Sequence, residues 1–122
     1  MLDNNKCILV YNVPESDVKA IEKEGYKIII VKDDMTNMTI KDILEGFKFE
    51  TFNPNTINES VILFNNFLDE ELKDSIKKIR ETVKGGILAT VTEHSVNWEF
   101  NYLAEHLAEE REWFLKQQKG RA

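Results

Sequence analysis

Seven polar residues could form a ligand site, because each follows one of four apolar runs that we expect to be strands. They are amides, carboxylates, a hydroxyl and an imidazole, groups that hold polar ligands, bind cations or transfer protons. In a parallel sheet, they would line a single crevice beyond the carboxyl ends of the strands. The seven residues are Asn12, Asp33, Asp34, Asn65, Thr92, Glu93 and His94.

The chemistry of these residues has two interpretations. Asn12 and Asn65 would flank the centre of the crevice as a pair of amides; either they hold a polar ligand, or each caps a helix or ties its loop through an Asx-turn. His94, beside Glu93 and Thr92, is the cluster suited to acid–base chemistry. No spacing supplies a nucleophile or an orienting partner, so an exposed loop histidine is the alternative.

Two acidic clusters raise the question of a metal site. Asp33 and Asp34 could bind a divalent cation together with Glu93, or they are ordinary surface acids. The second cluster has helical i, i+3, i+4 spacing, which fits either a metal pair or a solvated, salt-linked face. It consists of His106, Glu109 and Glu110. We predict no bound metal and no cofactor.

A nucleotide is not an expected ligand. A phosphate cradle needs glycines between strand and helix, whereas the five glycines here lie mostly where helices should end. Acids at 15, 17 and 69–71 already occupy the positive ends of helix dipoles. The net charge of −6 opposes contact with nucleic acid and with anionic membranes, so neither is an expected partner.

The composition indicates one soluble globular domain. The 122 residues are 42% hydrophobic and 31% charged, and the single cysteine excludes an internal disulfide. Cys7 lies in an apolar run without an adjacent base, so we expect a small buried hydrophobe. The polar segment 1–6 is unlike a signal peptide, and no apolar run approaches the ~20 residues of a membrane helix. We therefore expect a cytoplasmic protein.

The apolar pattern predicts two β-α-β-α half-repeats, at about 6–47 and 60–110, within a single domain that spans 1–122. A connector covers 48–59, and whether 48–52 adds a strand is left open. Strands are expected at 7–13, 26–31, 61–67 and 87–92, and helices at 14–24, 39–47, 69–84 and 97–118. The likeness of the halves reflects either an internal duplication or the pattern that any two such halves share.

This order of elements predicts an α/β fold with a four-stranded parallel sheet. Strands that alternate with helices are normally parallel, because the helices form the crossovers. We expect the strand order 2-1-3-4, helices on both faces, and a switch point between the first and third strands.

The second half also resembles a known family. The carrying motifs are VILFNNF, the acid-rich helix start DEELKDSIKKIRE, the strand GGILATVT and the helix start VNWEFNYLAEHLAEE. They resemble a bacterial and archaeal domain of unknown function of the DUF3783 type, matched mainly by 60–110. This resemblance implies an α/β fold and brings no activity with it.

The whole chain is similar to a response-regulator receiver that has lost its chemistry. ILVYNVPE, VILFNNF and ILATVT stand where receivers carry their site strands. Asn12 and Val13 replace the magnesium-binding acids, Phe64 and Asn65 replace the acceptor aspartate, and the fifth strand with its lysine is missing. The resemblance therefore implies a receiver-like regulator that cannot be phosphorylated in the usual way.

The C-terminal helix is longer than the predicted sheet requires. A strand of five or six residues spans ~17–20 Å, so a helix from 97 would have covered the sheet near 108. The overhang, 108–118, carries Trp113, Phe114 and Leu115 among charged residues. Clustered exposed aromatics indicate an interface. Either these side chains join two copies in a homodimer, or they fold back on their own domain.

These observations favour a non-enzymatic binding module that self-associates or binds a protein partner through its C-terminal helix. Two alternatives stay open: a small-molecule or metal-dependent enzyme with its site at the strand ends, and the phosphorylation-incompetent regulator.

Overall fold

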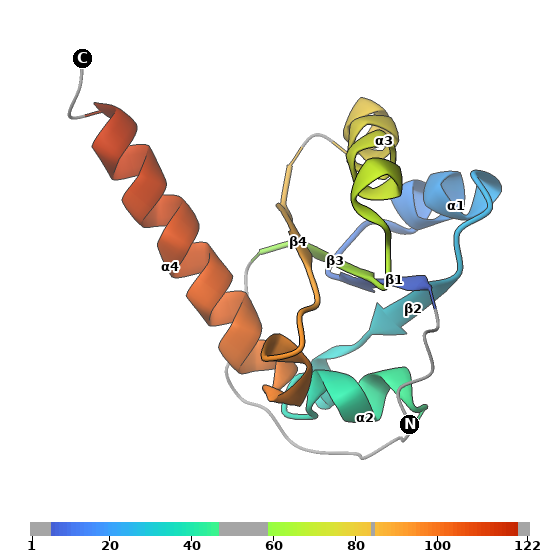
Figure 1. The fold of residues 1–122 in the computed structure, drawn as a ribbon, viewed down its shortest axis with the longest axis horizontal. Helices are drawn as coiled ribbons and strands as arrows, with labels where there is room; N and C mark the ends of the chain where they lie inside the picture. Colours follow the sequence, from blue (N-terminus) through green and yellow to red (C-terminus); the bar gives the residue numbers. More distant parts are fainter. Residues whose placement is uncertain (1–5, 47–58, 84, 120–122) are drawn as a thin grey trace.

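The computed structural model describes residues 6–46, 59–83 and 85–119. Figure 1 shows a sheet between two pairs of helices, with one helix that extends well beyond it. The strands are β1 (Cys7–Tyr11), β2 (Ile28–Val31), β3 (Val61–Asn65) and β4 (Ile87–Thr90). The helices are α1 (Glu15–Lys23), α2 (Ile40–Leu44), α3 (Asp69–Thr82) and α4 (Phe100–Lys119), with short 3-10 turns η1 (Asp33–Met35) and η2 (Ser95–Asn97).

The sheet has the predicted strand order but not the predicted direction. Its order is β2-β1-β3-β4. The pairs β1–β2 and β3–β4 are parallel, whereas the central pair β1–β3 is antiparallel. The prediction of a wholly parallel sheet was therefore wrong. β3 starts at Val61 opposite Tyr11, at the end where β1 finishes, and it ends at Asn65 opposite Cys7.

The physical reason for the error is that a buried strand carries no mark of its direction. Both central strands are apolar on both faces, and residues 7–11 and 61–64 are all buried. Such a run pairs equally well with a parallel or an antiparallel neighbour. Each β-α-β unit is internally parallel, as its helix crossover requires. That requirement does not apply to the pairing of β1 with β3, because these strands belong to different units.

The antiparallel pairing relates the two halves through two matched contacts. Leu9 pairs with Leu63, and Thr39 forms an isolated antiparallel bridge with Glu99. The two residues of these pairs are 54 and 60 positions apart in the sequence. The half-repeat as a true duplication stays a prediction.

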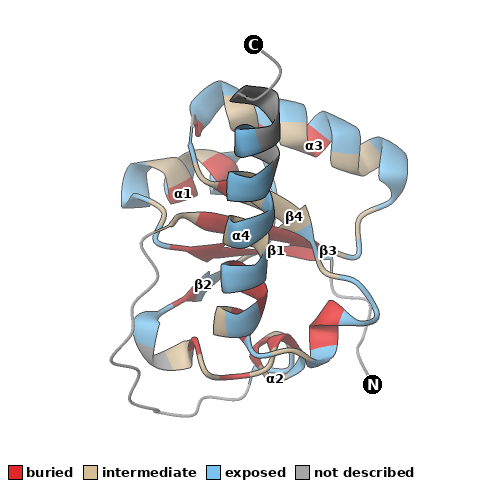
Figure 2. Cartoon of the chain, turned by 90° about the vertical axis from the view of Figure 1, so that its left-hand side faces the viewer, coloured by how far each residue is buried: buried red, intermediate tan, exposed pale blue. Residues whose placement is uncertain are grey.

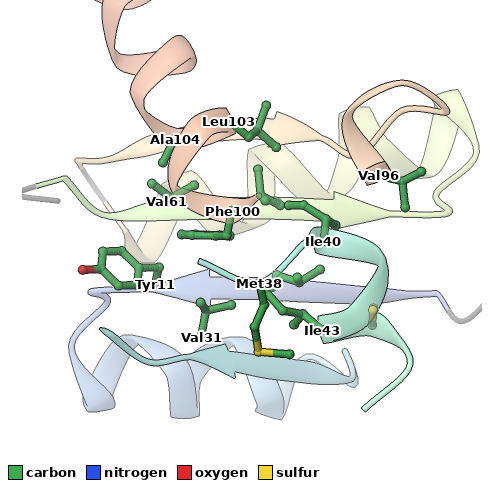
Figure 3. Close-up of a cluster of buried hydrophobic side chains, with 13 residues drawn as sticks. Tyr11, Val31, Met38, Ile40, Ile43, Val61, Val96, Phe100, Leu103 and Ala104 are labelled. Carbon is green, nitrogen blue, oxygen red and sulfur yellow. The ribbon is translucent and has the colours of Figure 1, made fainter. Parts of the chain in front are cut away.

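The helices cover the sheet in two layers, each over its own core (Figure 2). α1 and α3 pack on one face, over Ile8, Val10, Ile62 and Phe64. α2 and the first turns of α4 pack on the other, where Phe100 and Ile40 are fully buried (Figure 3). Burial of side chains of this size stabilises the fold by about 1.5–3 kcal/mol each.

Local sequence features begin and end the elements, and the helix cap predicted at Thr39 is present. The Thr39 hydroxyl accepts a hydrogen bond from the Asp42 backbone N–H at 3.2 Å and so caps α2. Asn12 and Asn66, which follow β1 and β3, adopt positive φ angles of 56° and 63°. Asparagine tolerates that left-handed conformation better than most residues.

The predicted connector, the open question of a strand at 48–52 and the Phe47 end of the second helix lie outside the described residues, except for Glu59. Within the part of the chain that the structure describes, no helix is both long enough and apolar enough to cross a bilayer.

Candidate functional site

Because the central strand pair is antiparallel, the residues of the predicted crevice lie at two opposite ends of the sheet. The carboxyl ends of β1 and β2 lie at one end, with Asn12 and with Asp33 and Asp34 of η1. The carboxyl ends of β3 and β4 lie at the other, with Asn65 and the segment 92–94. The seven residues thus form two groups and not one rim. Any binding role for either group stays a prediction.

At the first end, polar groups hold the backbone together. The Tyr11 hydroxyl donates a hydrogen bond to Asp33 Oδ1 at 2.5 Å. The carbonyl of Asn12 accepts one from the Ser60 hydroxyl at 2.6 Å. Both contacts join segments that are distant in sequence, so they fix how β1 meets η1 and the start of β3.

At the second end, Thr92 and Ser95 form a local turn. The Thr92 N–H donates to Ser95 Oγ at 2.8 Å, and the Ser95 N–H donates to Thr92 Oγ1 at 3.0 Å. Glu93 and His94, between them, are exposed. Asn65 is half-buried, and its Nδ2 lies 4.0 Å from Cys7 Sγ. Among the described residues, no group of three or more histidine, cysteine or acidic side chains could hold a metal ion.

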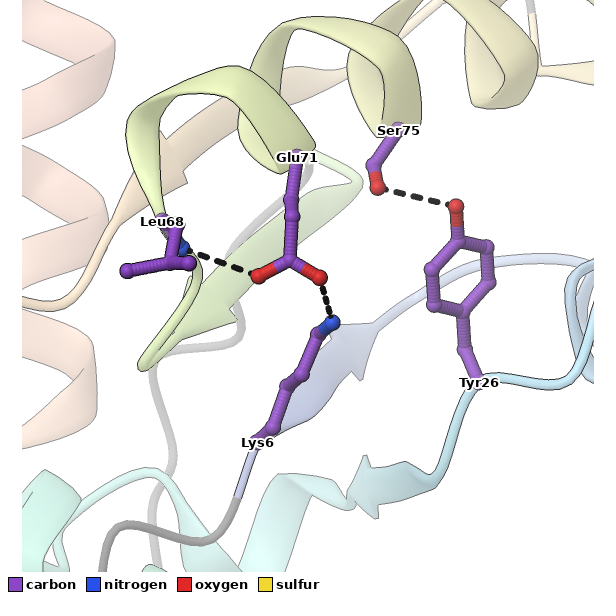
Figure 4. A network of polar contacts seen from close by, with 5 residues as sticks. All are labelled: Lys6, Tyr26, Leu68, Glu71 and Ser75. Carbon is purple, nitrogen blue, oxygen red and sulfur yellow. Dashed lines mark hydrogen bonds and ion pairs between the residues drawn. The ribbon is translucent and has the colours of Figure 1, made fainter.

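A groove between α3, the start of β1 and the turn that follows α1, which the sequence did not predict, is lined largely by charged residues. Its volume of about 390 Å³ falls within the range of about 300–1,000 Å³ typical of ligand pockets. Figure 4 shows Glu71 between the Lys6 ammonium and the backbone N–H of Leu68. Beside it, the Tyr26 hydroxyl donates to Ser75 Oγ at 2.8 Å. These contacts tie α3 to β1 and to the start of β2.

Two groups in this groove have shifted pKa values. The hydrogen bond from Lys6 holds the pKa of Glu71 below its ordinary value, with help from the Leu68 N–H. Burial raises the pKa of the Cys7 thiol, although Lys27 and Asn65 act in the opposite direction. Cys7 is only 1% exposed, which confirms the predicted buried hydrophobe. A neutral buried thiol is a poor nucleophile, so the surroundings of Cys7 do not activate it.

The most distinctive surface lies on the outer side of α4. Trp98 contacts Tyr102 edge to face, with ring centroids 5.0 Å apart, and contacts His106 in the same way at 5.7 Å. Tyr102 and His106 stack at 6.4 Å. A shallow hollow joins His106 to Trp113, with Glu109 and Glu110 as its other lining residues. We call Trp98, Tyr102, His106 and Trp113 the aromatic row.

Trp98 packs partly against the core, whereas the members of the aromatic row on α4 face away from it. At 100° per residue, Tyr102, His106 and Trp113 lie on one side of α4, and the buried residues Phe100, Leu103 and Ala104 lie on the other. Tyr102 is 55% exposed and Trp113 is 63% exposed. In Figure 2, α4 crosses the front of the molecule, and the outer side of its middle turns is exposed, with none of the other described helices and strands over it.

Charged residues flank the row and fix the helix. His106 Nε2 lies 3.1 Å from Glu110 Oε1, a contact that is an ion pair when the imidazole is protonated. Arg111, on the inner side, forms an ion pair with Glu59. That pair holds the middle of α4 to the segment before β3, beyond the last buried residues of the helix.

The predicted helix overhang is present. Figure 1 shows α4 extending past the sheet, and Leu115, like Trp113, is exposed. The side chain of Phe114 lies outside the described part of the chain. Sequence reasoning missed the first part of the row, although the i, i+4, i+8 spacing of Trp98, Tyr102 and His106 was a signal that could have revealed it.

The comparison with protein families adds one match. Residues 60–114 match the family model of DUF3783, a domain of unknown function. The match confirms the resemblance of the second half, covers just under half of the chain, and includes the whole aromatic row. No curated protein and no solved structure matches the chain. The likeness to receivers is not shown.

Proposed function

We propose that the protein is a non-enzymatic interaction module that self-associates through the outer side of α4. The observation that carries the proposal is the aromatic row, in which Tyr102 and Trp113 are large, exposed aromatic side chains on a side of α4 that no other described helix or strand covers. Monomeric proteins rarely expose such rows, and aromatic residues are enriched at interfaces.

The attachment of the helix supports the same role. The first turns of α4 are buried against the sheet through Phe100, Leu103 and Ala104. The ion pair between Arg111 and Glu59 attaches a later turn of the helix. The row is therefore presented on a rigid element, which lowers the entropy lost on association. A helix needed only to cover the sheet would have no use for the turns beyond Ala108.

The proposal is tested by removing the row. In the double variant Tyr102→Ala/Trp113→Ala, we expect a monomer at all concentrations, whereas the wild type becomes increasingly dimeric as its concentration rises. Size-exclusion chromatography with light scattering measures both. Each truncated side chain is exposed in the monomer, so circular dichroism should show an unchanged fold.

The matched control removes exposed apolar side chains elsewhere. Leu68 and Ile30 are 73% and 53% exposed and lie off α4. The variant Ile30→Ala/Leu68→Ala should dimerise like the wild type. A wild type that is monomeric throughout would overturn the proposal, as would a control variant that loses self-association as fully as the α4 variant.

A further inference from the structure

We infer that two copies pair through antiparallel α4 helices, with Tyr102 of each copy opposite Trp113 of the other and His106 opposite Glu109. The inference rests on the proposed function and adds its geometry. It starts from the spacing of the outer residues, because positions 102, 106, 109 and 113 are separated by 4, 3 and 4 residues. This is the spacing of the facing positions in a two-helix coiled coil.

The order of residue types along this stripe is complementary to its own reverse. Reading from 102 to 113 gives aromatic, imidazole, carboxylate, aromatic. In the antiparallel arrangement, a two-fold axis passes between positions 106 and 109. Each aromatic ring then meets an aromatic ring of the second copy, and each imidazole meets a carboxylate. Self-complementarity of this kind is what a two-fold symmetric interface requires.

The parallel arrangement lacks this complementarity. It would place Glu109 against Glu109 and His106 against His106 at the centre of the contact. Like charges that face each other at a partly desolvated interface cost free energy and act against such a pairing. The stripe from Tyr102 to Trp113 is about 16 Å long, so one unfavourable pair at its centre would affect much of the contact.

The antiparallel register also brings two flanking acids together. Glu105 and Glu112, both exposed, lie on the same border of the stripe. In antiparallel helix pairs, residues on this border face the equivalent border of the partner. Glu105 of one copy would then face Glu112 of the other, twice per dimer. This mild repulsion provides a test that leaves the aromatic row intact.

The test is a charge-reversal cycle on that border. Glu105→Lys or Glu112→Lys alone turns both repulsive pairs into attractive ones, so each should lower the dissociation constant about fivefold to tenfold. The double variant again pairs like charges, so its dissociation constant should return to within about twofold of wild type. The control is Glu22→Lys, at an exposed position of α1, which changes the net charge as much as either single variant does. Sedimentation equilibrium gives all five constants.

The outcomes separate the register from the proposed function. Two single variants that tighten while the double variant does not would support the antiparallel register, because only facing residues couple in this way. Additive tightening, or equal tightening by Glu22→Lys, would overturn the register while leaving self-association intact. A wild type and variants that all stay monomeric would overturn both.

Discussion

Lys6 and Glu71 show how single residues hold the two halves of this protein together. They are 65 residues apart, yet the antiparallel β1–β3 pairing brings the start of β1 to the end of β3, and their side chains form an ion pair. Lys6 Nζ also lies 5.0 Å from the centre of the Phe67 ring. Glu71 further accepts a hydrogen bond from the N–H of Leu68, where α3 begins. One carboxylate thus both caps a helix and fixes a strand.

The lowered pKa of Glu71 predicts a specific pH dependence. Because the folded state favours the ionised carboxylate, its contribution is complete above the unfolded-state pKa of about 4.3 and is lost as the pH falls through the lower folded-state value. Glu71→Gln should therefore lower the free energy of unfolding at pH 7 and flatten its decline in acid. Urea denaturation at pH 7 and at pH 3 measures both effects.

The Lys6–Glu71 pair supplies its own control. Lys6→Gln removes the group that lowers the pKa most, so it should also flatten the acid dependence, and Lys6→Gln/Glu71→Gln should flatten it no further than Glu71→Gln. An acid dependence in Glu71→Gln equal to that of the wild type would contradict this account of the contact.

At the scale of elements, short connections decide how the units close. The turn from α3 to β4 is held by Arg80, whose guanidinium donates to the carbonyls of Gly85 at 2.8 Å and Gly86 at 3.1 Å. Gly86 has a φ angle of +87° and lies directly against Ser60, the residue before β3. The β4 edge can approach β3 at this point because position 86 has no side chain.

Gly86→Ala should therefore destabilise the fold more than the equivalent change at another turn. An added Cβ would lie 2.9 Å from the Ser60 carbonyl oxygen, besides the strain of a positive φ angle. Gly25, which ends α1, has a similar φ angle of +95° but open space around it. We expect losses of about 1–2 kcal/mol for Gly25→Ala and about 2–4 kcal/mol for Gly86→Ala, measured by chemical denaturation. Equal losses would mean that the contact with Ser60 does not constrain this turn.

At the scale of the whole molecule, the sequence predicted the elements and their order but not the direction of the central pair. Thr39, Gly25 and the buried stripe of Val18 and Ile21 were readable because caps and helical periodicity are local. The β1–β3 pairing was not, because the apolar runs CILVY and VILFN have no intrinsic direction. The predicted single crevice required parallel strands, so in the antiparallel arrangement its residues lie at two ends of the sheet.

Part of the α4 surface was predictable because it also depends on local features of the sequence. The overhang followed from helix length against strand length, and Trp113 stood out as an aromatic residue among charges. The groove at Lys6 and Glu71 could not be anticipated, since no local spacing relates residues that only the antiparallel pairing brings together. The family match to residues 60–114 agrees with a second half whose helices and strands could be predicted without the first half.

The most direct test of the central claim is whether Trp113 becomes buried between molecules. The chain has two tryptophans, so Trp98→Phe leaves Trp113 as the only tryptophan while keeping an aromatic ring at position 98. We predict that acrylamide quenching of its fluorescence decreases, and its emission shifts to the blue, as the protein concentration rises from micromolar to millimolar. Quenching and emission that stay constant over that range would contradict self-association through the aromatic row.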